Sequence, residues 1–468
     1  MHFPLTSAIF RPEHCDPLFL LRELGLRRDY CALLESADRH GSNNFSFVAL
    51  GARDRVIVQD GMVSGSRYIP DGKTTDALSM FENMFQPSDA TVRLSMGYIG
   101  FLSFEAARHF ESVALPPNPD IPDAMFVLPE VLLKIDHGRK TITMIAHDDS
   151  REDLREIERA LNTSPYFDDR RGKQDMPGSS AALPTIEDIE TYRQTSREDF
   201  CASVKKIQEE ILAGEAFQVV LSQELRIPNG VPPDRVYEEL RKINPSPYMY
   251  YYQTPQLVIV GASPETLVRV EGRDVLYRPI AGTRRRTGDP EQDRAMHDEL
   301  ISDEKERCEH QMLVDLGRSD IGRIAEIGSV RVQDPFHVEQ YAHVFHIVSD
   351  ITARIREGCS SLDVLRSVFP AGTLTGAPKV RAMEIIRRLE GGPRGIYGGA
   401  FGYIDLGGNL DFAITIRTML FQNNVISLRV GAGIVKDSIP EREDDECLHK
   451  ARSCLAALHL ARTSLVAS

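Results

Sequence analysis

The feature that most constrains this chain is an acidic helical pattern over residues 302–323, SDEKERCEHQMLVDLGRSDIGR. Helical spacing places Glu306, Glu309, Leu313 and Leu316 on one stripe, so carboxylates and leucines share a face. A solvated helix turns its acids away from its leucines. Two inward carboxylates one turn apart repel each other, and burial increases that cost. The pattern therefore predicts a positive partner, and Mg²⁺, which takes hard oxygen ligands, fits best.

A second helical pattern near the C-terminus supplies the matching half of such a site. Residues 438–441, SIPE, read as a capping box with proline in the first turn. The helix that follows carries Glu443, Glu446 and Lys450 at positions i, i+3 and i+7. Its expected apolar face consists of Cys447, Ala451, Cys454, Leu455 and Leu458. Each E-x-x-E pair alone is more typical of a charged surface helix, so the metal hypothesis depends on the surrounding sequence.

Composition narrows the class of protein. The chain has 468 residues, of which 42% are apolar and 26% charged, as expected for a globular protein with a large core. A net charge of −14 without a long basic block argues against nucleic acid as a partner. There is no apolar run of the roughly 20 residues that cross a bilayer, and no signal-peptide pattern. Seven cysteines without a C-x-x-C predict a reducing, cytoplasmic location and neither a disulfide framework nor structural zinc.

Periodic patterns along the chain predict groups of strands alternating with helices. Hairpins are expected at residues 124–146 and 256–280, and helices at residues 150–161 and 197–213. Residues 31–36, CALLES, are expected to be a helix end or a loop that feeds a strand. Because strands are grouped with strands, the patterns favour an α+β fold over a parallel βαβ sheet.

The chain is expected to contain three regions. Residues 1–162 form an N-terminal region, and residues 187–468 carry the stronger motifs. Residues 163–186 are polar and rich in Pro, Gly and Ser, which is typical of a linker or mobile loop. In the C-terminal region, residues 216–224 read as a strand and residues 398–435 as a β-meander.

Two glycine-rich stretches do not match phosphate-binding loops. Residues 372–379, GTLTGAPK, lack the G-x4-G-K-[ST] spacing, and residues 431–433, GAG, lack the third glycine of a dinucleotide loop. Gly372 and Gly376 still permit a tight turn whose N–H groups could bind a carboxylate, and an ordinary turn fits them equally well.

From about residue 197 to residue 460, ordered motifs resemble the chorismate-utilising enzymes, and within them the anthranilate synthase component I group. The matching segments are FQVVLSQ, GASPETLVRV, PIAGTRRR, DEKERCEHQMLVDLGRSDIGRI, YAHVFHIVSDI, FPAGTLTGAPKVRAMEII, GIYGGAFGYID, FAITIRT and VGAGIVKDSIPEREDDE. The resemblance implies an anthranilate synthase-type fold, in which antiparallel β-sheets pack together and are flanked by helices. It also implies a chorismate-binding catalytic domain over residues 187–468.

Two positions separate the reactions within this family. Members that add water carry a lysine as general base where this chain has Gln218, which cannot take a proton from water at neutral pH. Aminodeoxychorismate synthases carry a nucleophilic lysine where this chain has Ala281. Both departures favour an anthranilate synthase that uses ammonia. The alternatives are aminodeoxychorismate synthase component I and an isochorismate or salicylate synthase.

The resemblance implies roles for single residues. Glu309 and Glu446 would bind Mg²⁺ on the ring carboxylate of chorismate, with Glu306 and Glu443 completing the coordination or orienting water. Glu265 would protonate the departing C4 hydroxyl, which requires a raised pKa. Pyruvate elimination is associated with His346, and Gln218 completes the catalytic set. The expected substrate-binding residues are Thr373, Tyr397, Arg417, Gly431, Ala432, Gly433 and Lys450.

Three of these residues also have purely structural interpretations. His346 and Thr373 could be hydrogen-bonded core residues. Arg417 lies in an otherwise apolar strand pattern, FAITIRTML, where a buried arginine needs an anionic partner. A structural salt bridge would satisfy it, but we rank ligand binding first.

The N-terminal region contributes the motif LLES at residues 33–36, and residues 244–249 read NPSPYM. In the family these segments line a pocket for tryptophan as feedback inhibitor, and this chain contains no tryptophan itself. Glu35 is expected to pair with the ammonium group and Ser36 to bind a polar end. The full expected set is Leu34, Glu35, Ser36, Pro245, Ser246, Pro247, Tyr248 and Met249.

The resemblance also concerns partners. The chain contains no glutaminase motif, so ammonia is expected from a separate glutamine amidotransferase subunit in a hetero-oligomer. A non-enzymatic alternative is a tryptophan-sensing module with an inactive site, and the two intact E-x-x-E patterns argue against it.

Overall fold

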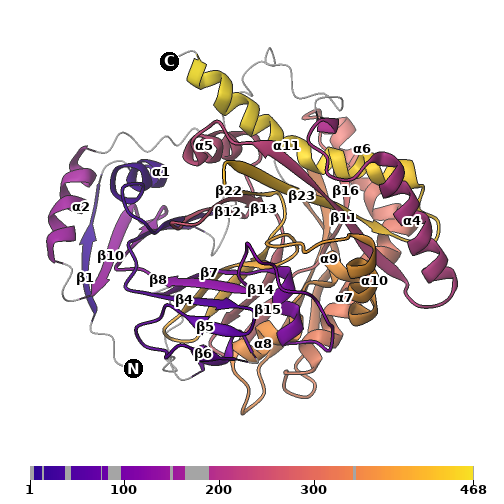
Figure 1. Ribbon diagram of the computed structural model, residues 1–468, viewed down its shortest axis with the longest axis horizontal. Helices are drawn as coiled ribbons and strands as arrows, with labels where there is room; N and C mark the ends of the chain where they lie inside the picture. The colour runs from indigo at the N-terminus through magenta and orange to yellow at the C-terminus, as the bar shows by residue number, and fades with distance from the viewer. Residues whose placement is uncertain are drawn as a thin grey trace.

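The computed structural model describes residues 5–12, 15–36, 44–74, 76–82, 96–147, 151–163, 189–340 and 344–466 of the chain. Two large antiparallel β-sheets pack against each other and helices surround them (Figure 1). Within the described residues, sheet 1 has 11 strands and sheet 2 has 12. This arrangement confirms the predicted α+β class with packed antiparallel sheets.

Sheet 1 extends from N-terminal strands at one edge to later strands at the other. In order across the sheet, its strands are β1 (Leu5–Phe10), β10 (Thr141–His147), β9 (Val131–Asp136), β3 (Phe45–Leu50), β2 (Cys31–Glu35), β12 (Tyr248–Gln253), β13 (Val258–Ser263), β22 (Thr418–Gln422), β23 (Val425–Ile434), β11 (Gln218–Pro228) and β19 (Gly376–Ala377). Because β2 pairs with β12, the LLES and NPSPYM segments are neighbours in space.

Sheet 2 likewise mixes early and late strands. In order, they are β16 (Ile280–Arg285), β18 (Val344–Arg354), β15 (Asp274–Tyr277), β14 (Thr266–Glu271), β21 (Leu410–Ile414), β20 (Ala400–Asp405), β7 (Gly97–Leu102), β8 (Ala124–Leu128), β4 (Asp54–Gln59), β5 (Met62–Ser64) and β6 (Gly72–Lys73), with β17 (Arg331–Gln340) paired to β18. Strands from both sides of the expected linker therefore share each sheet. Residues 164–186 of that linker lie outside the described residues.

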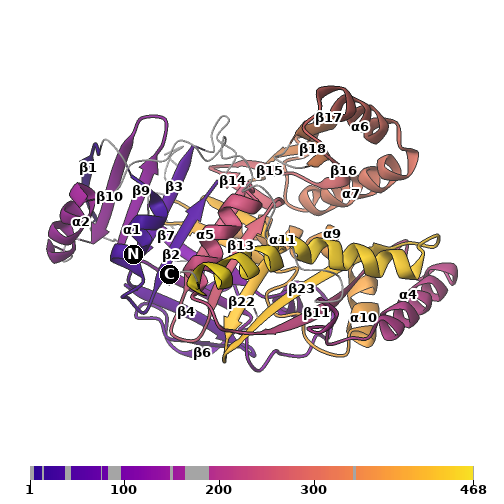
Figure 2. The same cartoon turned by 90° about the horizontal axis from the view of Figure 1, so that it is seen from above.

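The helices cover the sheets and connect them. They are α1 (Pro17–Leu20), η1 (Leu21–Gly25), η3 (Ser79–Phe81), η4 (Phe104–His109), α2 (Arg151–Thr163), α4 (Arg197–Leu212), α5 (Pro233–Ile243), α6 (Pro290–Ser302), α7 (Glu304–Gly322), α8 (Ser361–Val368), α9 (Gly372–Thr375), α10 (Lys379–Leu389) and α11 (Pro440–Val466). The long helix α11 packs with α4 and α5 on the outer face of sheet 1 (Figure 2). Within the described residues, no helix is both long and apolar enough to span a membrane.

Strand alternation separates two large apolar cores. On β12, Tyr250 and Tyr252 point into the core between the sheets, whereas Met249 and Tyr251 point into the core beneath α5 and α11. Figure 2 shows α6, α7 and β16 to β18 gathered at one end of the molecule, where a third small core contains Leu300. One acidic helix, α7, thus lies in this end lobe, while the other, α11, lies on sheet 1.

Most predicted elements are present in the structure. The acidic pattern forms α7, which Asp303 caps by accepting hydrogen bonds from the backbone N–H groups of Lys305 and Glu306. The predicted helices at residues 150–161 and 197–213 correspond to α2 and α4. The strand at residues 216–224 is β11, and the two hairpins contain the pairs β9–β10 and β14–β15.

Three local predictions were wrong. Residues 31–35 form strand β2, because their apolar side chains fill both faces of a fully covered sheet. The expected meander at residues 398–435 is two hairpins in different sheets: β20–β21 belongs to sheet 2 and β22–β23 to sheet 1. Helix α11 begins at Pro440, and Ser438 Oγ accepts a hydrogen bond from the Val435 N–H, so Ser438 is not the N-cap.

Candidate active site

The two acidic helices approach each other beside the start of β11. Gln218, the first residue of β11, donates from Nε2 to Oε1 of Glu309 on α7 at 3.2 Å. Burial raises the pKa of the Glu309 carboxyl, and the negative charges of Glu306 and of Glu446 on α11 raise it further. The structure therefore brings acids of both E-x-x-E pairs within electrostatic reach of one another. A cation between them would relieve this repulsion.

The other three acids have protein partners as well. Glu306 accepts from Arg284 at 3.2 Å, and Glu446 pairs with Lys450 at 2.7 Å. Burial raises the pKa of Glu443, and the Ser438 hydroxyl acts against that shift. Among the described residues, no three His, Cys, Asp or Glu side chains converge closely enough to hold a metal ion. The donor chemistry suits Mg²⁺, which needs only one or two protein carboxylates beside water and substrate oxygens.

A buried acid faces the same region from the loop between β13 and β14. Burial raises the pKa of Glu265 to about 7, while the Thr373 hydroxyl and the positive charges of Arg417 and Lys450 oppose the shift. The Thr373 Oγ1 atom is itself buried and has no hydrogen bond of normal geometry among the described residues. A carboxyl with such a pKa is partly protonated at neutral pH, as a general acid requires.

Arg417 lies at the crossover between the two sheets, between the end of β21 and the start of β22, and so not inside a strand as the sequence suggested. Its φ of 49° is in the left-handed region, which non-glycine residues rarely occupy. Burial lowers the pKa of its guanidinium, while Cys454 and the Glu265 carboxylate act against this shift. Within the described residues Arg417 forms no ion pair, and Glu265 acts on it only through its charge. A buried arginine without such a partner is available to an anion.

His346 reaches the site from β18 in the end lobe. Its Nδ1 lies 2.9 Å from the carbonyl oxygen of Gly282, and because a carbonyl can only accept, Nδ1 carries the proton. Burial lowers the pKa of His346 to about 4. The imidazole is therefore neutral at physiological pH, with its lone pair on Nε2.

Two glycines of β23 leave room beside these groups. A Cβ on Gly433 would lie 2.4 Å from Nε2 of Gln218, and one on Gly431 would lie 2.6 Å from the Tyr397 hydroxyl. Lys450 donates from Nζ to the carbonyl oxygen of Gly431 at 2.9 Å. The side chain of Ala432 points the other way, into the core under α11. The predicted substrate-binding residues thus surround one region, although Ala432 contributes only backbone.

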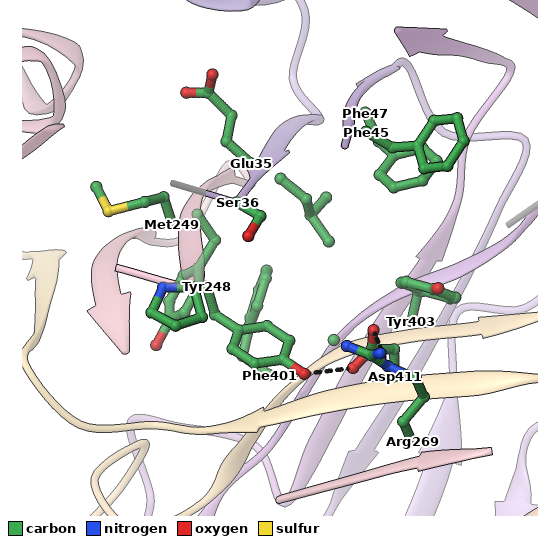
Figure 3. A pocket seen from close by; sticks show the side chains of 14 residues that line it. Glu35, Ser36, Phe45, Phe47, Tyr248, Met249, Arg269, Phe401, Tyr403 and Asp411 are labelled. Atoms are coloured by element: carbon green, nitrogen blue, oxygen red, sulfur yellow. Dashed lines mark hydrogen bonds and ion pairs between the residues drawn. The ribbon is translucent and has the colours of Figure 1, made fainter. Parts of the chain in front are cut away.

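A second candidate site lies between the two sheets. Figure 3 shows the side chains that line this pocket. Its empty space, with the adjoining open solvent included, is about 600 Å³. Its lining residues are Leu34, Glu35, Ser36, Phe45, Phe47, Pro247, Tyr248, Met249, Tyr250, Arg269, Phe401, Gly402, Tyr403 and Asp411. Of the residues expected to bind tryptophan, Pro245 and Ser246 do not line it.

Glu35 lines the pocket but makes its side-chain contacts elsewhere. Glu35 and Met249 are opposite each other in the β2–β12 ladder and share one face of the sheet. Both residues border the pocket, but their side chains point away from its centre, and that of Met249 packs into the core beneath α5 and α11 (Figure 3). The Glu35 carboxylate accepts from the Tyr237 hydroxyl at 2.7 Å and pairs with Arg241 at 3.0 Å. The carboxylate therefore contacts α5 in this structure, and its expected pairing with an ammonium group remains a prediction.

A second acid, which the sequence analysis did not name, lines the pocket. Asp411, on β21, accepts from the Tyr248 hydroxyl at 2.7 Å and from Nε of Arg269 at 3.1 Å within the pocket (Figure 3). Arg269 and the aromatic Tyr403 also come from sheet 2. The sequence signal for Asp411 was an acid in the otherwise apolar strand LDFAI. That signal does not reveal a pocket, because the pocket forms only where strands of the two sheets meet.

Comparison with known proteins agrees with this arrangement. Residues 30–456 match the family model for chorismate binding enzymes. The chain is 42% identical to anthranilate synthase component 1 of Thermus thermophilus over 441 residues, which are 92% of this chain and 93% of that protein. It is 40% identical to anthranilate synthase component 1 of Aquifex aeolicus over 464 residues, 96% of this chain and 93% of that protein.

Solved structures show the same fold. The crystal structure of anthranilate synthase component I from Streptococcus pneumoniae superposes with a TM-score of 0.73 and 33% identity, covering 89% of this chain and 93% of that one. The isochorismate synthase MenF of Escherichia coli has a TM-score of 0.71 at 19% identity, covering 98% of this chain and 96% of that one, which shows the fold alone. The chain belongs to the chorismate-binding enzymes. Within that family, its similarity to anthranilate synthase component 1 extends over nearly the whole chain.

Proposed function

We propose that this chain is the large component of an anthranilate synthase, which converts chorismate and ammonia to anthranilate and pyruvate. The observation that carries this proposal is the Gln218 amide on Glu309. At the position where water-adding relatives need a base, this site offers a hydrogen-bond donor that cannot accept a proton from water. The nucleophile must therefore arrive already competent, as ammonia does.

The first step would form a bond from nitrogen to C2 of the ring while the C4–O bond breaks and the ring double bonds shift. Glu265, partly protonated at neutral pH, donates its proton to the departing oxygen, so that water leaves. Arg417 and Lys450 supply positive charge to hold the carboxylates. The near-planar guanidinium suits a two-point grip on one carboxylate.

The second step would eliminate pyruvate and make the ring aromatic. The hydrogen at C2 must be removed as the bond from C3 to the enolpyruvyl oxygen breaks. His346 fits this task because its neutral imidazole has the proton on Nδ1 and a lone pair on Nε2. The released enolpyruvate takes a proton to become pyruvate.

We propose Glu309 and Glu446 as the Mg²⁺ ligands, with Glu306 and Glu443 completing the coordination or orienting its water molecules. Bound there, the ion would withdraw electron density from the ring through the ring carboxylate. Burial and then the neighbouring acids raise the pKa of Glu309. This shift supports the proposal, because a bound cation would supply the positive charge that these carboxylates need.

A single assay tests the main proposal. The purified chain, given chorismate, Mg²⁺ and an ammonium salt, should form fluorescent anthranilate, identified by mass spectrometry, together with one equivalent of pyruvate. Activity should increase with pH as NH₃ becomes more abundant. Isochorismate, salicylate or aminodeoxychorismate as the main product would contradict the proposal. Tryptophan binding without any turnover would support the non-enzymatic alternative instead.

A partner subunit follows from the same chemistry. We propose that a glutamine amidotransferase delivers ammonia, so the chain alone should not use glutamine. Activity of the purified chain with glutamine in the absence of ammonium would refute this. We also propose a cytoplasmic location, supported by seven cysteines that are all free thiols in the structure.

We further propose that the pocket between the sheets binds tryptophan as a feedback inhibitor. The rings of Phe45, Phe47 and Phe401 offer an apolar slot for indole, and the Asp411 carboxylate can meet the ammonium group. Ser36 can bind a polar end. Calorimetry should detect tryptophan binding to the wild-type chain, and no binding would refute the regulatory proposal while leaving the catalytic one intact.

A further inference from the structure

Behind the candidate chorismate site lies an ion pair that the mechanism above does not use. The side chains of Arg394 and of Glu390, at the end of α10, are each only 1% exposed. Arg394 donates to Glu390 from Nε at 2.9 Å and from Nη2 at 2.6 Å. The same carboxylate accepts from the Ser222 N–H at 2.7 Å and from Arg429 at 3.3 Å. Burial opposes ionisation of Glu390, yet the positive charges of Arg394 and Arg429 keep its pKa lowered.

The remaining donors of Arg394 reach two elements of the site. Nη1 donates to the carbonyl oxygen of Leu374 at 2.6 Å, and Nη2 donates to that of Val220 at 2.8 Å. Leu374 follows Thr373 on α9, and Val220 lies two residues after Gln218 on β11. One guanidinium thus ties together two elements that carry proposed site residues.

Two aromatic contacts and a buried acid fix Arg394 itself. The guanidinium lies 5.5 Å from the ring centre of Tyr397, a third proposed site residue, and 4.5 Å from that of Phe104. On the other side, Glu105 of η4 accepts the backbone N–H groups of Arg394 at 2.7 Å and of Gly395 at 3.0 Å. The backbone and the side chain of Arg394 are therefore both fixed by these contacts.

Stability alone does not explain this network. Replacing a buried ion pair by apolar side chains of similar volume is often neutral or stabilising, whereas the fork of an arginine sets geometry in several directions at once. The Leu374 carbonyl lies in the last turn of a four-residue helix, where carbonyls have no partner within the helix. Arg394 supplies that partner and so fixes the helix that presents Thr373.

We propose that Arg394 is a positioning residue for chorismate turnover, which holds Thr373, Gln218 and Tyr397 in one arrangement through α9, β11 and its own aromatic contact. This inference rests on the proposed function of the site. Arg394 itself touches no reacting atom.

The first test is Arg394→Lys. Lysine keeps the charge for Glu390, but one ammonium group cannot also reach both carbonyls. We expect kcat with chorismate and ammonium to fall about 10–100-fold, as expected for a small misplacement of site groups. KM should change less than kcat, and the melting temperature should remain within a few degrees of the wild type. The control is Arg381→Lys on α10, the helix that ends next to Glu390. Its partners Glu215 and Glu384 are solvent-accessible, and its kcat should be unchanged.

A double-mutant cycle separates positioning from mere stability. Thr373→Val should lower kcat in the wild-type background but have little further effect in Arg394→Lys, because Thr373 is already misplaced there. Losses that multiply, or an Arg394→Lys enzyme with near wild-type kcat, would overturn the proposal. If Arg394→Lys does not fold, Glu390→Gln serves in the same cycle, since it keeps volume and an acceptor oxygen. Chorismate affinity can also be measured by calorimetry for the same four proteins of the cycle. That measurement tests the inference even if the product is not anthranilate.

Discussion

The hydroxyl of Tyr250 lies 2.6 Å from the hydroxyl of Thr418, and this contact joins the pocket between the sheets to the crossover that carries Arg417. Thr418 Oγ1 donates to the Ile416 carbonyl at 2.7 Å, so the tyrosine hydroxyl donates to Thr418. The Tyr250 ring lines the pocket and stacks on Phe401, with ring centres 4.3 Å apart. A ligand bound between the sheets and a carboxylate bound to Arg417, as proposed above, would therefore act on the two ends of one short chain of contacts.

From this geometry we expect Tyr250→Phe to reduce the coupling between the two sites. The ring and its stacking remain, so tryptophan should still bind with an affinity close to that of the wild type. Inhibition should weaken, because allosteric coupling is a free energy, typically about 1–3 kcal/mol, that both sites share. The measurement is the chorismate KM with and without saturating tryptophan, beside a calorimetric Kd.

Thr418→Val is the matched variant, since it removes the other hydroxyl of the pair. If Tyr250→Phe and Thr418→Val each keep the full wild-type shift in KM, the contact does not carry the coupling. Reciprocity provides a second check: chorismate should weaken tryptophan binding by the same factor in every variant.

Glu309→Gln or Glu446→Gln should abolish Mg²⁺-dependent turnover. Each substitution removes one hard oxygen anion from a site with few protein ligands, and Glu309→Gln also removes a buried charge whose pKa is raised by burial and by the acids around it. Magnesium affinity by calorimetry should therefore fall while the melting temperature of Glu309→Gln does not. Asp315→Asn on the exposed face of α7, where Asp315 pairs with Arg318, is the control and should behave as the wild type. Full activity in excess EDTA would show that the metal hypothesis is wrong.

The raised pKa of Glu265 predicts the pH dependence of the chemical step. The carboxyl must be protonated to donate, so at a constant concentration of NH₃ kcat should fall as pH rises through about 7. In Glu265→Gln this dependence should vanish and activity should drop by about 10²–10⁴-fold, the usual contribution of a general acid. A flat profile in the wild type at constant NH₃ would contradict the assignment.

The same pKa has a consequence for stability. Burial raises the folded-state pKa above that of the unfolded chain, so the folded state holds a proton that the unfolded state has lost. The contribution of Glu265 is complete below the unfolded-state pKa and decreases as pH rises through about 7. Glu265→Gln should therefore be more stable relative to the wild type at pH 8 than at pH 5, measured by urea denaturation.

The features of this fold that could be predicted from the sequence are those whose cause lies within one short segment. Helix α7 follows from the spacing of Glu309 and Leu313, because period and capping lie within the segment itself. The sequence also showed the glycine pair of the motif GAG on β23. In the structure, Gln218 leaves no room for a Cβ at Gly433, the second glycine of this pair. Motif order then placed nearly all proposed chorismate contacts in one region.

What could not be predicted depends on how distant strands meet. The continuous pattern FAITIRT gives no sign that β21 and β22 belong to different sheets, with Arg417 at the break. Periodicity of two also leaves the choice of face open, and for Glu35 the face is decided by Arg241 and Tyr237, more than 200 positions away. Asp411 becomes a pocket residue only once sheet 2 packs on β12.

The last prediction concerns which acid meets the ammonium group of tryptophan. Asp411→Asn keeps the size of the side chain and can still accept from Tyr248, but it removes the negative charge inside the pocket. Hydrogen bonds to charged groups contribute about 1.5–3 kcal/mol, so the Kd for tryptophan should rise by about 10–100-fold. Glu35→Gln is the comparison, because Glu35 is bound to Tyr237 and Arg241 on the opposite face of β2. That variant should lower the melting temperature while changing the Kd less than Asp411→Asn does. If calorimetry instead shows that Glu35→Gln loses tryptophan binding while Asp411→Asn retains it, the LLES glutamate is the ammonium partner and its side chain must turn into the pocket when tryptophan binds.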